Sequence, residues 1–257
     1  MTEPILALKG VRKAFGGVAA VDGVSFEVFP REILAVIGPN GAGKTTLFNL
    51  ITGALKMDEG DVLLKGHSLK RLAPHQVVKL GIARTFQNVQ LFGNMTVIEN
   101  VMVGRHVRSR TGFLSAALST PAARAEERTI REKAMESLAF VGLQDKAQEP
   151  ALGLPFGQQR LLAIARALAS EPQVLLLDEP GAGLNATETA ELGRLILSLR
   201  EMGITIMLVE HDMNLVMTIA DRVIVLDYGV LIAEGPPSLV QNDARVIAAY
   251  LGDDLDL

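Results

Sequence analysis

Four short apolar runs stand out because no regular alternation with polar residues occurs within them. They are Ile33–Ile37, Val174–Leu177, Ile204–Val209 and Val223–Leu226. Strands that are buried on both faces of a parallel sheet have this pattern. The runs therefore predict four short strands at the centre of such a sheet.

Between these runs, apolar residues recur at the spacing of a helix. The two clearest faces are Leu161, Ile164, Ala165 and Leu168, and Leu192, Leu195, Ile196, Leu199 and Met202. Strands that alternate with helices predict an α/β sheet joined by crossover helices.

Residues 4–30 and 61–65 have a different pattern, that of short strands separated by turn residues. The expected turns lie at Lys9-Gly10, at Phe15-Gly16-Gly17 and at Asp22-Gly23. We expect these strands to form an antiparallel sheet beside the parallel core.

Residues 88–160 contain no convincing parallel strand and are interpreted as a mostly helical insertion. Ile130, Ala134, Leu138 and Val141 form one apolar stripe after Pro121. Near the end of the chain, the sequence predicts a hairpin over residues 223–234, with its turn at residues 227–229. A final helix is expected over residues 236–251.

The composition is that of an ordinary globular protein, with 49% hydrophobic and 21% charged residues in 257. The net charge of −4 argues against a general nucleic-acid-binding protein. The absence of cysteine excludes disulfides and cysteine-ligated metals. The longest uncharged run, Thr85–Ile98, is too short to span a membrane, and the N-terminus lacks the features of a signal peptide. The cytosol is therefore the expected compartment.

The strongest motif is Gly38–Thr45, which reads Gly-Pro-Asn-Gly-Ala-Gly-Lys-Thr and matches G-x-x-x-x-G-K-[ST]. A predicted strand precedes it and a helical segment follows, which is the context that a phosphate-binding loop requires. Backbone N–H groups and the helix N-terminus would face phosphate oxygens. Lys44 would contact the β- and γ-phosphates, and Thr45 would offer a hydroxyl to Mg²⁺. A chance glycine-rich turn is the alternative.

A second motif is the pair Asp178 and Glu179, which directly follows a buried strand. Ligands bind at the carboxyl ends of the strands in parallel sheets. Asp178 would therefore lie near the Mg²⁺ of the phosphate loop, and Glu179 would act on the attacking water. Without the phosphate loop, simple capping of the next helix would also explain these acids.

These motifs occur in the order of an ATP-binding cassette, and the chain resembles the ATPase subunit of an ABC transporter over nearly its whole length. Gln87 occupies the Q-loop position, Leu154–Gln158 the signature position, Gly181–Asn185 the D-loop, and His211 the switch position. Phe15 stands where the family places an aromatic ring against adenine. Taken alone, Phe15 could be a core residue, Gln87 a surface amide and His211 a structural histidine.

The resemblance implies one ABC domain over residues 1–257 with a RecA-like P-loop core, an antiparallel β subdomain and a helical subdomain. Residues 1–87 and 161–257 would form the core and β subdomain, and residues 88–160 the helical subdomain. The implied catalytic residues are Glu179, His211, Lys44 and Gln87, and the implied Mg²⁺ ligands are Thr45, Gln87 and Asp178. The implied ATP contacts are Phe15, Gly38, Asn40, Gly41, Ala42, Gly43, Lys44, Thr45 and Thr46, with Gly157 and Gln158 from the opposite cassette.

More specific segments resemble the longer ATPase of the bacterial branched-chain amino acid importers. They include residues 105–113, residues 153–160 and the terminal Ala249-Tyr-Leu-Gly-Asp. The resemblance implies membrane permeases and a second ATPase as partners, and a periplasmic binding protein as an indirect one. It places the protein on the cytoplasmic face of the inner membrane. The basic residues 105–110 are either a solvated loop or a contact with acidic lipids or the membrane partner.

Two residues depart from the family pattern. Pro155 replaces the signature serine, whose hydroxyl normally bonds the γ-phosphate of the opposite site. Asn185 replaces the usual D-loop aspartate. Three other functions stay open: the ATPase of a lipid or lipopolysaccharide exporter, an ABC ATPase of translation or DNA repair, and a cassette that holds ATP without hydrolysis.

Overall fold

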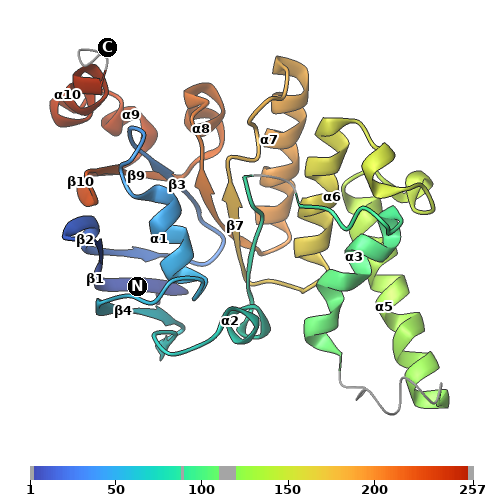
Figure 1. Cartoon of the computed structure of the whole chain (residues 1–257). Helices are drawn as coiled ribbons and strands as arrows, with labels where there is room; N and C mark the ends of the chain where they lie inside the picture. Colours follow the sequence, from blue (N-terminus) through green and yellow to red (C-terminus); the bar gives the residue numbers. More distant parts are fainter. Residues whose placement is uncertain (1–2, 88–89, 110–119, 254–257) are drawn as a thin grey trace. The chain divides into compact units, whose positions relative to one another are not determined.

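A computed structural model describes residues 3–87, 90–109 and 120–253 of the chain. The chain divides into two compact units (Figure 1). The first comprises residues 1–77 and 173–257, and the second comprises residues 78–172. Each unit is described by itself.

A mostly parallel sheet forms the centre of the first unit. Its strands are β3 (Ile33–Ile37), β7 (Val174–Asp178), β8 (Thr205–Val209), β9 (Arg222–Asp227) and β10 (Val230–Gly235), and their order is β10-β9-β3-β8-β7. Every residue of β3, β7 and β8 is buried. The prediction of four buried strands is confirmed, as is the hairpin that joins β9 to β10.

The register of the parallel strands brings three loops to one edge of this sheet. Val209 at the end of β8 pairs with Val36 of β3 on one side and with Asp178 of β7 on the other. The segments that begin at Gly38, Glu179 and Glu210 therefore leave the sheet at the same level. This edge is where parallel sheets bind ligands.

The second sheet of the first unit is antiparallel, as predicted. It has the order β2-β1-β4-β5 and consists of β1 (Leu6–Phe15), β2 (Val18–Val28), β4 (Glu59–Leu64) and β5 (His67–Ser68). The turn at Gly16-Gly17 is present, but the predicted turns at Gly10 and Gly23 are wrong. Both glycines have positive φ and lie inside long strands where the register shifts. They therefore form bulges, which glycine accommodates as readily as turns.

Helices accompany these sheets in the first unit. They are α1 (Lys44–Ile51), α7 (Ala186–Glu201), α8 (Met213–Ile219), α9 (Pro237–Val240) and α10 (Ala244–Asp253). The prediction of a single final helix over residues 236–251 is wrong, because residues 241–243 are not helical and separate α9 from α10. The Asp243 carboxylate accepts a hydrogen bond from the N–H of Arg245, so it caps a new helix. The short helix α2 (Pro74–Leu80) leads into the second unit.

The second unit is mostly helical. It contains β6 (Ile82–Arg84), α3 (Val97–Arg105), the 3-10 turn η1 (His106–Arg108), α5 (Pro121–Phe140) and α6 (Phe156–Leu168). Two further 3-10 turns, η2 (Gln144–Lys146) and η3 (Ala151–Gly153), lie between α5 and α6. Helices α3, α5 and α6 pack against one another (Figure 1). Ile130, Ala134 and Leu138 are buried on α5, as the stripe predicted. Among the described residues, no helix is long and apolar enough to cross a membrane.

Candidate functional site

The loop from Gly38 to Gly43 joins β3 to α1, and two of its glycines allow a close approach of backbones. A Cβ atom on Gly38 would lie 2.1 Å from the carbonyl oxygen of Leu226. One on Gly43 would lie 2.2 Å from the carbonyl oxygen of Ala20. Gly43 also has φ +99°, a left-handed conformation that glycine adopts without strain. Packing therefore forces the loop to curl tightly at the N-terminus of α1, where backbone N–H groups are available for an anion.

The side chains at this helix N-terminus suit phosphate chemistry. Lys44 is buried, and its Nζ donates to the carbonyl oxygens of Gly38 at 2.6 Å and Pro39 at 2.8 Å. Its charge is thus held inside the curl of the loop. Thr45 is exposed, so its hydroxyl can reach a ligand. Of the other predicted contacts, Asn40 and Gly41 are exposed, Ala42 is buried and Thr46 is half-buried.

Tyr250 of α10 contributes a contact that the sequence analysis missed. Its hydroxyl lies near the backbone of Gly38, the first residue of the loop. Its ring packs against the core cluster that includes Ile37. Burial raises the pKa of this tyrosine above its usual value of 10.0, whereas the nearby backbone of Gly38 acts in the opposite direction. The C-terminal helix therefore packs beside the end of β3, next to the start of the phosphate loop.

The two carboxylates after β7 have different surroundings. Asp178 is the last residue of the strand and is buried. Glu179 has φ +47°, which is unusual for a residue with a side chain, and its N–H donates to the carbonyl oxygen of Val209 at 2.9 Å. Strained backbone of this kind often occurs at functional sites. The bend lets the Glu179 side chain leave the line of the strand.

The Glu179 carboxylate meets His211, the residue two positions beyond the end of β8. The imidazole Nε2 lies 2.9 Å from Oε1 of Glu179. Because an ionised carboxylate only accepts hydrogen bonds, this contact places a proton on Nε2. Glu179 and His211, which are far apart in the sequence, thus form a pair at the edge of the sheet that also carries the phosphate loop.

Phe15 is the last residue of β1 and directly precedes the Gly16-Gly17 turn. Its side chain is 48% exposed, so the alternative of a core residue is wrong. The ammonium of Lys13 lies 5.4 Å from the centre of its ring. The exposed ring face is available to stack on a planar group.

The remaining predicted residues lie in a loop or at the N-terminal ends of helices. Gln87 is exposed in the second unit, and Asn185 of the first unit caps α7 by accepting from the N–H groups of Thr187 and Glu188. Helix α6 begins at Phe156, so Gly157 and Gln158 lie in its first turn and Pro155 is its N-cap. The Gln158 side chain accepts from Lys146 Nζ at 2.8 Å.

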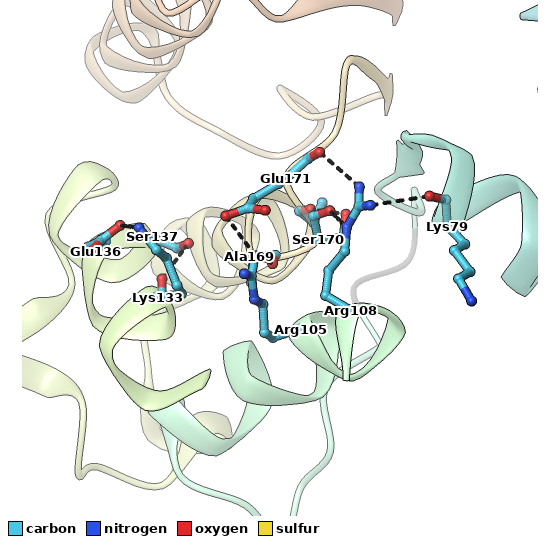
Figure 2. A network of polar contacts seen from close by, with 10 residues as sticks. Lys79, Arg105, Arg108, Lys133, Glu136, Ser137, Ala169, Ser170 and Glu171 are labelled. Carbon is cyan, nitrogen blue, oxygen red and sulfur yellow. Dashed lines mark hydrogen bonds and ion pairs between the residues drawn. The ribbon is translucent and has the colours of Figure 1, made fainter. Parts of the chain in front are cut away.

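The basic segment has a structural role that neither expectation described. Arg105 bonds the Glu171 carboxylate at 2.8 Å and the carbonyl oxygen of Ala169 at 3.3 Å. Arg108 donates to the carbonyl oxygens of Ser170 at 2.8 Å, Lys79 at 3.2 Å and Glu171 at 3.2 Å (Figure 2). Both arginines therefore cap the C-terminal end of α6, where cations are favourable. Arg110 lies outside the described residues.

The fold and the site together define a class of protein. A glycine-rich loop holds a buried lysine at a helix N-terminus, and β7, which is separated from β3 by β8 in the same sheet, ends in a buried aspartate. This combination is that of a P-loop nucleoside triphosphatase.

Comparison with known proteins identifies the family. The family profile described as "ABC transporter" matches residues 21–182, and a second profile, "Branched-chain amino acid ATP-binding cassette transporter", matches residues 230–256. The chain therefore belongs to the ABC transporter family of nucleotide-binding proteins, which are ATPases.

Individual relatives agree with this assignment. The high-affinity branched-chain amino acid transport ATP-binding protein LivG of Escherichia coli (strain K12) is 45% identical over 254 residues, which cover 98% of this chain and 100% of the relative. The corresponding protein BraF of Pseudomonas aeruginosa is 44% identical over the same shares of the two chains.

Solved structures show the same fold. The ADP conformation of MJ1267, an ATP-binding cassette of an ABC transporter, has a TM-score of 0.85 and 35% identity and covers 98% of this chain and 100% of its own. The dimeric cassette MJ0796 has a TM-score of 0.77 and 28% identity and covers 90% and 98%. The prediction of a RecA-like P-loop core of the ABC type is confirmed.

Proposed function

We propose that this chain hydrolyses ATP to energise the import of branched-chain amino acids through separate membrane permeases. The observation that carries the catalytic part is the Glu179–His211 pair, which lies at the sheet edge that also carries the phosphate loop. The names of the full-length relatives and the match over residues 230–256 support the transported class.

The phosphate loop and the N-terminus of α1 bind the triphosphate. Backbone N–H groups of Gly41, Gly43 and their neighbours surround the phosphate oxygens, with the residues from Gly38 to Thr46 as the binding set. Lys44 exchanges its contacts with Gly38 and Pro39 for the β- and γ-phosphates. Phe15 stacks its exposed ring on adenine.

The donor set fits Mg²⁺, a hard cation that prefers oxygen ligands. Thr45 offers a hydroxyl, Asp178 a carboxylate and Gln87 an amide oxygen, and none of these ligands is a softer sulfur or nitrogen donor. When bound, the cation neutralises charge on the β- and γ-phosphates. We assign it to Thr45 and Asp178 of the first unit, and Gln87, which belongs to the second unit, stays a ligand implied by the family resemblance.

Hydrolysis depends on orienting one water molecule in line with the γ-phosphate. Glu179 accepts a proton from this water or holds it in place. His211 turns its Nε2–H from Glu179 toward a γ-phosphate oxygen, where developing charge needs a donor. Its exposure leaves room for this rotation.

The complete site requires a second cassette. Gly157 and Gln158, in the first turn of α6, contact the ATP that is bound to the opposite subunit, which matches the dimeric state of the MJ0796 relative. We propose that the second subunit is a non-identical ATPase. The other proposed partners are two membrane permeases and a periplasmic binding protein, which does not contact this chain directly. The protein acts at the cytoplasmic face of the inner membrane.

Two measurements test this proposal at different levels. Phosphate release from Mg·ATP by the purified chain should exceed that of the Glu179→Gln variant, and Lys44→Ala should abolish ATP binding. Deletion of the gene should abolish uptake of labelled leucine by cells, and the parent gene should restore it. If the purified chain releases phosphate but deletion of the gene does not change the uptake of leucine, isoleucine or valine, the ATPase activity stands and the proposed transported class is wrong.

A further inference from the structure

A buried acid beside the catalytic pair is not used by the proposed chemistry. Glu210 lies between the end of β8 and His211, and only 3% of its surface is exposed. Its Oε1 accepts a hydrogen bond from the N–H of Gly181 at 2.6 Å. Its Oε2 accepts from the N–H of His211 at 3.0 Å and, more weakly, from that of Asp212 at 3.4 Å. A carboxylate with backbone donors on both oxygens forms strong, charge-assisted bonds.

These bonds join the two loops that carry the catalytic pair. Glu179 belongs to the loop after β7, together with Gly181, whereas His211 follows β8. Where the loops begin, the N–H of Glu179 already bonds the carbonyl oxygen of Val209. Glu210 provides the second connection, further from the sheet. Two connections fix the angle between the loops, which a single one leaves free.

The position of the Gly181 backbone determines the position of Glu179, because both lie in one hydrogen-bonded turn. The N–H of Ala182 bonds the carbonyl oxygen of Glu179 at 3.2 Å, and the N–H of Leu184 bonds that of Gly181 at 3.1 Å. The loop is therefore a short, internally bonded turn rather than an extended chain. A shift of Gly181 relative to Glu210 moves the turn that holds the Glu179 side chain.

Gly181 is shaped for this contact. A Cβ atom on it would lie 2.8 Å from Oε1 and 3.4 Å from Cδ of Glu210. Its φ lies outside the left-handed region, so alanine would fit the backbone, but its methyl group would have to displace the Glu210 carboxylate. The glycine and the acid thus form a matched pair across the two loops.

We propose that Glu210 is a positioning residue that couples the loop after β7 to the loop after β8 and thereby holds His211 against Glu179. The role rests on the proposed ATP hydrolysis. Glu210 acts only through the backbone of its neighbours. Glutamine cannot replace it, because one of its two ends is an NH₂ group that would face an N–H donor.

The test compares Glu210→Gln with Glu201→Gln, an exposed glutamate on α7 that serves as the matched control. In the full-length protein, Glu210→Gln should lower kcat about 10-fold or more, with KM for ATP and ATP affinity changed less than about 2-fold. Glu201→Gln should match the parent. Melting temperatures of all variants show whether each one is folded.

A double-mutant cycle separates positioning from general stability. In a His211→Ala background, Glu210→Gln should lower kcat less than about 2-fold, because the residue to be positioned is gone. Gly181→Ala, which disturbs the same contact from the other side, should lower kcat in the parent. It should have no further effect in a Glu210→Ala background, where the carboxylate that it meets is absent.

The results distinguish this inference from the function on which it rests. Parent kcat for Glu210→Gln, or the same fold-loss with and without His211, would overturn the positioning role. A parent no faster than Glu179→Gln would overturn the proposed ATP hydrolysis itself, and the role of Glu210 would fail with it.

Discussion

The imidazole Nε2 of His211 lies 2.9 Å from Oε1 of Glu179, although 32 residues separate the two in the chain. Adjacent parallel strands, β8 and β7, bring them together, since Val209 and Asp178 pair in register. The pair predicts the same kind of effect for a substitution at either residue. Glu179→Gln should retain ATP affinity and reduce hydrolysis about 100-fold or more, because an amide cannot take a proton from water. His211→Ala should also retain binding and reduce hydrolysis.

Phosphate release and ATP binding, measured on the same preparations, check this prediction. Lys44→Ala is the comparison variant, because loss of the lysine should reduce binding itself. Wild-type turnover by Glu179→Gln would remove Glu179 from the mechanism.

Phe15 offers an exposed ring at the end of β1, and stacking on adenine predicts a cost on its removal. Phe15→Ala should weaken ATP affinity by about 1–2 kcal/mol, treating ring–base stacking by analogy with nucleic-acid sites. Phe15→Tyr and Phe15→Trp should bind normally, because both keep an aromatic face. Leu239→Ala, at an exposed apolar residue of α9, is the control for loss of surface area. Unchanged affinity of a folded Phe15→Ala protein would contradict the stacking role.

Tyr250 should make stability depend on alkaline pH. Its pKa is raised, chiefly by burial, so the neutral phenol is favoured in the folded protein. The resulting stabilisation is fully present below the usual tyrosine pKa and is lost as the pH rises through the higher pKa of the folded state. Tyr250→Phe should therefore weaken the fall of melting temperature above about pH 10.

The chain provides its own control for this effect. Tyr228 is 79% exposed, and Tyr228→Phe should leave the alkaline profile unchanged. Identical alkaline profiles for the parent and Tyr250→Phe would contradict the effect of burial on the Tyr250 hydroxyl.

Arg108 donates to three carbonyl oxygens in the second unit, so its removal should destabilise the protein. Arg108→Ala should lower the free energy of unfolding by about 1–3 kcal/mol, since the carbonyl groups lose charged donors. Arg108→Lys should recover only part of this, because an ammonium lacks the planar fork that reaches all three acceptors. Urea unfolding measures the differences. Arg128→Ala, at an exposed position of α5, should be neutral, and equal losses at both positions would contradict the capping role.

The parts of the fold that the sequence predicted correctly are those where one local pattern has one structural meaning. The continuous apolar runs of β3 and β7 are buried throughout, so their hydropathy directly reflects their surroundings. Gly10 and Gly23 were misread because glycine serves both turns and bulges, and only the pairing of β1 with β2 distinguishes them. The start of a second helix at Asp243 could not be predicted, because the apolar residues before and after it keep the spacing of one continuous helix.

The same distinction applies to the site. The phosphate loop and Asp178 could be predicted because each follows a recognisable buried strand. Glu210 and Tyr250 could not, because their roles are defined by contacts with Gly181 and Ile37, which are distant in the sequence. The only signal for Glu210 was an acid directly after an apolar strand and before His211, a position that suggests the sheet edge but not the partner.

Pro155 is the N-cap of α6, and its side chain makes no capping hydrogen bond. Proline has no donor either, so the ATP site completed by this subunit's first turn of α6 lacks the contact that a serine would provide. The loss of one neutral hydrogen bond amounts to about 0.5–1.5 kcal/mol, which is roughly a tenfold effect at most on the closed dimer. Pro155→Ser should therefore strengthen ATP-dependent pairing only slightly. It should also stabilise α6 by about 0.5–2 kcal/mol through a new cap.

Sedimentation of the Glu179→Gln variant with Mg·ATP, with and without Pro155→Ser, checks the expected pairing. We expect the chain alone to be a monomer or a weak dimer with slow hydrolysis, and to become fast when a second, non-identical cassette and the permeases are added. The phosphate loop, Asp178 and the Glu179–His211 pair are intact. Pro155 should therefore weaken the association of two cassettes and not the hydrolysis step itself. A tight homodimer of the purified chain with fast basal hydrolysis would refute the heteromeric assembly while leaving the ATPase in place.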